Sequence, residues 1–233
     1  MDERLEAIEA GTAPEDLATK IMTTADPETG HMFDREEMID QVAIFFLAGH
    51  ETSASALAWG IYLLAYDQDV QARVAKEVQT TKTDFKSLNT MKLTRNVFHE
   101  TLRLYAPVPM LVREATKPAT FRERDVKPGD LCILSAWHSG RHERIWENSH
   151  EFLPDRWDNL PSHCRDAYFP FSGGSRICIG AGFALIEGLL GLSTLARHFE
   201  FTLGDEEPVP VAHLTTRSKA GISLRITKRP QNK

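Results

Sequence analysis

The sequence contains little cysteine, and Cys132, Cys164 and Cys178 form no Cys-x-x-Cys pair. A disulfide framework of the kind that staples small secreted domains is therefore not indicated. A tetrahedral zinc site is not indicated either, because His163 merely adjoins Cys164 and adds no ligand spacing. The first residues also lack the apolar run of a secretory signal peptide, so we expect a reducing, cytoplasmic location.

Positive charge is also scarce, since 27 Lys and Arg face 33 Asp and Glu and the formal net charge is −6. Without a block of like charges, this balance argues against a nucleic-acid partner or a basic membrane patch. The most apolar stretch, residues 42–66, is interrupted by Gly49, His50, Glu51 and Thr52. We therefore expect a long buried helix there and no transmembrane segment.

Turn signals divide a helix-rich first part of the chain from a second part of loops and short strands. A Pro- and Gly-containing turn at 26–30 precedes a D-x-x-E pattern at 34–37, which is typical of a helix N-terminus. Apolar residues then recur at three- and four-residue steps, on a face that we expect to meet cofactor or substrate. Thr94 is expected to cap a later helix. The predicted helices cover 34–66, 70–79 and 94–105.

Beyond residue 107 the pattern changes to short apolar alternations between turns. Lys117-Pro118 and residues 127–130 are the clearest turn signals, and the segments around them alternate as small-sheet strands do. We expect strands at 111–113, 120–121 and 131–135 and a hairpin over 213–227. The whole sequence thus indicates a mainly α fold with a small β portion.

The most specific pattern is the stretch Phe171 to Gly180, which reads F-S-G-G-S-R-I-C-I-G. Apolar residues follow it at helical spacing, so Cys178 is expected just before a helix N-terminus, where a sulfur anion is stabilised. Gly174 and Gly180 let the backbone approach a flat ligand, and the Arg176 guanidinium can pair with a carboxylate. An anionic sulfur in such a loop is a suitable ligand for haem iron.

This stretch resembles the haem-binding signature of the cytochrome P-450 superfamily, the haem-thiolate monooxygenases. The resemblance implies that Cys178 is the axial ligand of haem b, with Phe171 packed beside the sulfur. It also implies that Arg176 and Arg113 bind the haem propionates. Without the resemblance, Cys178 would be interpreted as a small, inert apolar residue, as a lone cysteine usually is. Arg113 would be interpreted as an arginine at a strand edge that extends its charged end into solvent.

A second resemblance lies in residues 48–53, A-G-H-E-T-S, inside the predicted long helix. The resemblance implies that Thr52 steadies bound dioxygen and that Glu51 passes protons from solvent. Taken alone, the same residues are a hydrogen-bonded threonine and a solvated glutamate. His50 is expected to be structural or to face solvent.

A third resemblance is the E-x-x-R pattern of Glu100 and Arg103. Such a pair is usually an exposed ion pair of little energetic weight. The resemblance adds Arg156 and implies a buried structural clamp that holds the cysteine loop in shape. Trp157 stands where the family commonly has phenylalanine, and we interpret it as a tolerated aromatic exchange.

The resemblance covers residues 17–229 and begins midway through the family pattern. We therefore expect the C-terminal part of the cytochrome P-450 fold, with a long oxygen-side helix, the E-x-x-R helix, short strands, the cysteine loop and the helix after it. Residues 1–233 are expected to form one partial catalytic domain. Its predicted parts are helical (17–106), strands and meander (107–170), and the haem-thiolate loop, helix and hairpin (171–229).

The function that the resemblance implies is haem-dependent insertion of one oxygen atom from O2 into a small, apolar organic substrate. An electron-donor protein of the ferredoxin or flavoprotein reductase type is implied as partner. Two alternatives stay open, a non-catalytic haem-binding module and a degenerate, truncated fragment. The presence of Glu51, Thr52 and the cysteine motif favours chemistry, whereas the missing early half favours a chain that is inactive alone.

Overall fold

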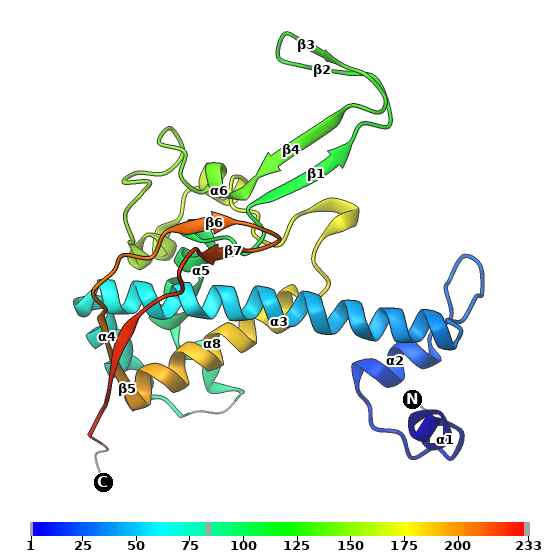
Figure 1. Ribbon diagram of the computed structural model, residues 1–233, viewed down its shortest axis with the longest axis horizontal. Helices are drawn as coiled ribbons and strands as arrows, with labels where there is room; N and C mark the ends of the chain where they lie inside the picture. The colour runs from blue at the N-terminus through cyan, green and yellow to red at the C-terminus, as the bar shows by residue number, and fades with distance from the viewer. Residues whose placement is uncertain (1, 83–84, 231–233) are drawn as a thin grey trace. The chain divides into compact units, whose positions relative to one another are not determined.

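The computed structural model describes residues 2–82 and 85–230, and these residues form a mainly helical structure with short strands (Figure 1). The fold class expected from the sequence is confirmed. The chain divides into two compact units, Met1–His50 and Glu51–Lys233, and helix α3 contributes residues to both. Within the described residues, no helix combines the length and apolar character needed to cross a membrane.

Helices carry most of the regular structure, and the long predicted helix is present with nearly the expected limits. The predicted helices over 70–79 and 94–105 are also present. The α-helices are α1 (Asp2–Glu9), α2 (Leu17–Thr23), α3 (Arg35–Tyr66), α4 (Gln68–Thr80), α5 (Lys92–Leu104), α6 (Ala136–Ser139), α7 (Ser162–Asp166) and α8 (Ala181–His198). Short 3-10 turns are η1 (Ser87–Thr90), η2 (Pro154–Asn159) and η3 (Gly174–Arg176).

The first unit contains α1, α2 and the start of α3, which begins at the predicted N-cap. Asp34 Oδ1 accepts the Glu37 N–H and Glu37 Oε2 accepts the Asp34 N–H, both at 2.9 Å. This reciprocal pair satisfies helix N-terminal N–H groups, as the D-x-x-E pattern predicts. On the apolar face that follows, Met38 is buried, whereas Val42 and Phe46 are exposed. Contact of that face with a cofactor or substrate stays a prediction.

The core of the second unit is built by the later part of α3 with α4, α5 and α8. Trp59, Val74, Val97 and Leu192 are each at most 1% exposed and belong to one apolar cluster. Helices α5 and α8 approach closely because Gly188 lacks a side chain. A Cβ atom at Gly188 would lie only 2.1 Å from the Phe98 ring. The glycine thus lets an aromatic ring lie directly on the α8 backbone.

The start of α5 differs from the sequence prediction. Thr94 does not cap the helix, because α5 begins at Lys92 and Thr94 lies inside its first turn. Glu77 of α4 accepts the Leu93 and Thr94 N–H groups, each at 2.8 Å, and the Thr94 hydroxyl at 2.6 Å. A carboxylate from the neighbouring helix therefore satisfies these N–H groups, which ties α4 to α5.

The strands pair antiparallel in two-stranded sheets. In Figure 1, β2 and β3 lie at the far end of the arm that β1 and β4 form. The pairs are β1 (Met110–Glu114) with β4 (Leu131–Ser135), β2 (Ala119–Phe121) with β3 (Arg124–Val126), β5 (Phe199–Leu203) with β8 (Leu224–Lys228), and β6 (Pro210–Ala212) with β7 (Thr216–Ser218). The three strands predicted before residue 136 are present.

The predicted hairpin over 213–227 is wrong. Strand β7 pairs with β6 before it, whereas β8 pairs with β5, which directly follows α8. The other edge of β5 is occupied by Gln71, whose amide accepts the Phe201 N–H at 2.8 Å and donates to the Phe201 carbonyl at 2.9 Å. With that edge bonded to Gln71, β8 completes β5 from the opposite side.

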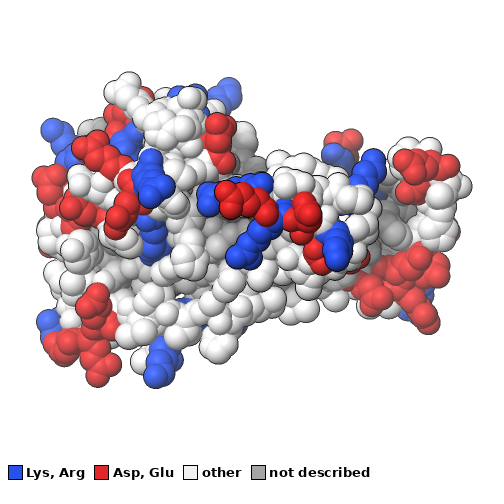
Figure 2. Space-filling model, turned by 90° about the horizontal axis from the view of Figure 1, so that it is seen from above, with Lys and Arg blue, Asp and Glu red and all other residues white. Residues whose placement is uncertain are grey.

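Charged residues of both signs share the surface drawn in Figure 2. Among the described residues on that face, Lys and Arg lie beside Asp and Glu, with wide uncharged areas between them. Opposite charges lie side by side over the second unit, whereas Asp and Glu predominate over the first unit, at the right of the view.

We predict that Gly188→Ala destabilises the chain by about 1–3 kcal/mol, because the added methyl group would overlap the Phe98 ring. Gly182→Ala, on the same helix, is the matched control, since nothing lies within 4 Å of its Cβ position. Its effect should stay within about 1 kcal/mol and be neutral or favourable. Urea unfolding of both variants measures the difference, and equal stability of the two would contradict the close approach of α5 and α8.

Candidate functional site

The cysteine loop folds back on itself ahead of α8. The Cys178 N–H donates to the Phe171 carbonyl at 2.9 Å, which closes the loop across residues 171–178. Ser172 and Gly174 have φ values of 63° and 65°, so the turn uses left-handed backbone conformations twice. Helix α8 begins at Ala181, and Cys178 therefore lies at the positive end of the helix, as the sequence predicts.

The Cys178 thiol lies among exposed apolar side chains. Cys178 itself is exposed, and Ile177, Ile179 and Phe183 are 59%, 80% and 72% exposed. No atom lies within 4 Å of a Cβ position at Gly174. The loop thus offers a thiol on an apolar surface with open space beside its backbone, which fits a flat, largely apolar ligand.

The described residues lack the ligand set of a metal bound by protein alone. Within 2–82 and 85–230, no group of three or more His, Cys, Asp or Glu side chains is placed to hold an ion. A single thiolate instead suits an iron whose other ligands come from a macrocycle. The donor chemistry at Cys178 is therefore compatible with haem.

One of the two predicted propionate-binding arginines contacts the loop directly. Arg113 on β1 donates from Nη2 to the Ser172 hydroxyl at 2.6 Å and from Nη1 to the Val112 carbonyl at 2.9 Å. Arg176 lies in η3 and is exposed. The structure thus places the Arg113 guanidinium against the loop and leaves Arg176, within the loop, exposed.

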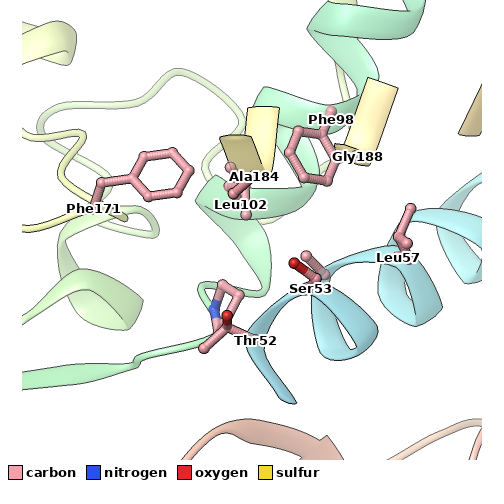
Figure 3. A pocket seen from close by; sticks show the side chains of 10 residues that line it. Thr52, Ser53, Leu57, Phe98, Leu102, Phe171, Ala184 and Gly188 are labelled. Atoms are coloured by element: carbon pink, nitrogen blue, oxygen red, sulfur yellow. The ribbon is translucent and has the colours of Figure 1, made fainter. Parts of the chain in front are cut away.

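A small cavity lies between α3, α5, α8 and the start of the cysteine loop. Its volume is about 30 Å³, enough for roughly one water molecule, and its walls are mostly apolar. Thr52 and Ser53 of α3 line it together with Phe171, Ala184 and Gly188 (Figure 3). The Ser53 hydroxyl donates to Glu187 at 2.5 Å. Thr52 and Phe171, predicted from separate motifs, therefore meet at one cavity.

Glu51 is held by the C-terminal part of the chain. Its carboxylate accepts the Thr215 hydroxyl at 2.6 Å and forms an ion pair with Arg217 on β7. Thr215 is buried, whereas Arg217 is exposed. Neither partner could be identified from the sequence, because Thr215 lies 164 positions from Glu51 and no local pattern connects them.

The Glu100 carboxylate is fully buried and receives donors from several segments. Arg103 Nε and Nη2 donate at 2.9 and 2.8 Å, and Arg156 Nε donates at 2.9 Å. The Leu153 N–H donates at 3.0 Å. Trp157, interpreted from the sequence as an aromatic exchange, also donates its indole N–H at 2.8 Å. The structure therefore joins the three predicted clamp residues and adds an indole donor.

Arg103 also connects the clamp to the irregular segment before η2. Its Nη1 donates to the carbonyls of Gly140 and Ser149 at 2.5 and 2.6 Å, and its Nη2 donates to that of Glu151 at 2.9 Å. The guanidinium stacks over Trp146, with its carbon 5.1 Å from the ring centroid. Carbonyls that lack partners in a helix or sheet are thus satisfied by a charged donor.

We predict that Glu100→Gln destabilises the second unit by about 3–5 kcal/mol, because it leaves buried guanidinium groups without an opposite charge. Asp155→Asn is the control, since the Asp155–Arg73 pair at 2.6 Å is largely exposed and should contribute less than about 1 kcal/mol. Denaturant unfolding of both variants measures the effect. A Glu100→Gln variant as stable as Asp155→Asn would show that the clamp carries no net electrostatic stabilisation.

Comparison with known proteins agrees with these features. The sequence profile of the cytochrome P450 family matches residues 1–226. Taurochenodeoxycholic 6 alpha-hydroxylase of Sus scrofa is 34% identical over 90% of this chain and 43% of its own length. Cytochrome P450 72A13 of Arabidopsis thaliana is 33% identical over 98% of this chain and 47% of its own length. Cytochrome P450 4A11 of Homo sapiens is 33% identical over 90% of this chain and 42% of its own length.

The chain thus spans less than half the length of these curated relatives. The matched region includes the helix with Thr52, the clamp helix and the cysteine loop. Because the family profile covers nearly all of the sequence and the relatives exceed 30% identity over most of it, this chain belongs to the cytochrome P450 family.

Proposed function

We propose that this chain carries the haem-ligating and oxygen-activating part of a monooxygenase, in which Cys178 would hold the iron of haem b. The observation that carries the proposal is the position of Cys178, in a closed loop at the N-terminal end of α8 and on an exposed apolar surface. Membership of the cytochrome P450 family supports haem as the cofactor and O2 as co-substrate.

The residues around Cys178 have distinct roles in this proposal. When bound, thiolate-ligated haem supplies O2 activation and transfer of one oxygen atom to the substrate. The N-terminal end of α8 stabilises negative charge on the sulfur, and the Phe171 carbonyl fixes the Cys178 backbone through its N–H. Arg113 and Arg176 provide guanidinium groups for the two carboxylates of haem b.

Thr52 and Glu51 are proposed to handle protons on the oxygen side. The Thr52 side chain lines the small cavity beside Phe171, so its hydroxyl can hold a hydrogen bond within a mostly apolar space. Glu51 precedes it on α3, and its carboxylate is oriented by Thr215 and Arg217. Glu51 would thus connect Thr52 to the solvent-exposed side of β7, where protons are available.

The substrate is proposed to be a small, apolar organic molecule, and an electron-donor protein of the ferredoxin or flavoprotein reductase type is proposed as partner. A relative named as a hydroxylase of taurochenodeoxycholic acid supports hydroxylation as the reaction type. Stoichiometric haem binding without turnover, in the presence of a complementary N-terminal portion, would favour the alternative of a non-catalytic haem-binding module.

We predict that Cys178→His removes the thiolate signature of the haem-bound chain. Haem is added to the chain co-expressed with the N-terminal portion of a relative, and the ferrous carbonyl spectrum is recorded. The unchanged chain should show the red-shifted thiolate band, and Cys178→His should show the histidine-type band instead. Cys132→Ser is the control, because Cys132 is an exposed thiol on β4, and it should keep the thiolate band.

A thiolate band that persists in Cys178→His would contradict the ligand assignment. Haem binding by the 233-residue chain alone is expected to be weak, since the apolar surface around Ile179 and Phe183 is open to water. Tight, stoichiometric binding and steady turnover by the chain alone would overturn that expectation.

We predict that Thr52→Ala keeps haem binding but lowers the product formed per cofactor oxidised by about tenfold, because the cavity loses its hydroxyl group. Thr52→Ser is the matched variant, since it restores the hydroxyl, and it should recover most of the coupling. The measurement is product and peroxide formed per electron donor consumed. Equal coupling in Thr52→Ala and the unchanged chain would return Thr52 to a purely structural role.

A further inference from the structure

We propose that His99, Trp157 and Tyr168 form a second anchor for the cysteine loop and act as positioning residues for Cys178. The inference rests on the proposed role of Cys178 as haem ligand and goes beyond the Glu100 clamp. His99 comes from α5, Trp157 from η2, and Tyr168 from the segment that leads into the loop. We refer to these three side chains as the aromatic anchor.

Trp157 connects the aromatic anchor to the clamp. Its indole N–H donates to Glu100 Oε2 at 2.8 Å, which fixes the plane and direction of the ring. The same ring stacks on His99, with centroids 5.0 Å apart, and meets Tyr168 edge-on at 4.6 Å. A phenylalanine at this position could pack in the same place but could not donate to Glu100.

His99 and Tyr168 are joined by a hydrogen bond of 3.0 Å between Nδ1 and the hydroxyl. Burial, with a smaller contribution from the positive charge of Arg95, lowers the pKa of His99 to about 4. Burial also raises the pKa of Tyr168 well above its usual value, with the Glu100 charge adding to the effect. Both groups are therefore neutral near pH 7, and their hydrogen bond holds without a change of charge.

Tyr168 is the fixed end from which the loop extends. The Phe169 carbonyl accepts the Ser172 N–H at 3.0 Å, and the Phe171 carbonyl accepts the Cys178 N–H at 2.9 Å. The path from the anchored ring to the thiol thus consists of short backbone turns with their own hydrogen bonds. A shift of Tyr168 would therefore move the Phe171 carbonyl and, with it, the Cys178 backbone.

The anchor is tested by amide hydrogen exchange of the full 233-residue chain, which needs no haem. Trp157→Phe removes the indole N–H and Tyr168→Phe removes the hydroxyl, while each keeps an aromatic ring. We expect each variant to speed exchange in residues 169–178 by about tenfold and to leave α4 within about twofold. Tyr66→Phe is the control, because the Tyr66 side chain is 62% exposed. In this variant, residues 169–178 should exchange as fast as in the unchanged chain.

Unchanged exchange of the loop would overturn the proposal, and so would an equal rise in every element, because that would mark a loss of global stability only. His99→Phe separates the hydrogen bond from ring packing. It should loosen the loop as much as Tyr168→Phe, and the double variant should loosen it no further, since both changes remove the same bond. If the increases in the exchange rate of residues 169–178 multiplied in the double variant, that result would contradict the His99–Tyr168 hydrogen bond.

The effect on the ligand is read from the haem-loaded chain, co-expressed with the N-terminal portion of a relative. Trp157→Phe should lower the fraction of the ferrous carbonyl in the thiolate band by at least about twofold, because the sulfur is less firmly held. An unchanged fraction would overturn the positioning role. If the unchanged chain showed no thiolate band while exchange of the loop still rose in both variants, the proposed function would fail and the anchor would stand.

Discussion

The buried Glu100 carboxylate organises the second unit, because a charge removed from water has to be met by donors from the protein. Those donors come from α5 itself and from residues 153–157 at the start of η2, so one carboxylate fixes how these two segments lie against each other. Arg103 extends the same network to carbonyls of Gly140 and Ser149. The irregular stretch between α6 and η2 is therefore held by charge-assisted hydrogen bonds in place of a helix or sheet.

In this arrangement, the residues proposed to hold the cysteine loop in place are different from the residue proposed to bind iron, Cys178. Cys178 lies on an exposed apolar surface, whereas the proposed supports of its loop are the buried Glu100–Arg103 pair and the aromatic rings bonded to it through Trp157. The left-handed backbone of Ser172 costs conformational energy, and Arg113 and the start of α8 hold the loop from other directions. Geometry at the sulfur is thus set by residues that do not touch it.

The sequence was sufficient where the signal is local or carried by a specific motif. The capping pattern at Asp34 and the apolar period placed α3, and the E-x-x-R pattern and cysteine motif identified Glu100 and Cys178. Partners distant in sequence were missed. Thr215 with Glu51, Trp157 with Glu100, and Glu77 at the start of α5 lie 164, 57 and 17 positions apart. The false hairpin at 213–227 has the same origin, because alternation predicts a strand and does not name its partner.

The amide of Gln71 also bears on how copies of this chain behave toward each other. A strand edge with open N–H and carbonyl groups invites a strand from another molecule, which is a common start of aggregation. Gln71 occupies the edge of β5 remote from β8 at Phe201, and β8 at the other side of the pair carries Arg225 and Lys228. One edge of this small sheet is thus occupied by a buried side chain, and the other carries charged side chains, with Arg225 paired to Asp205, so the sheet resists growth by strand addition.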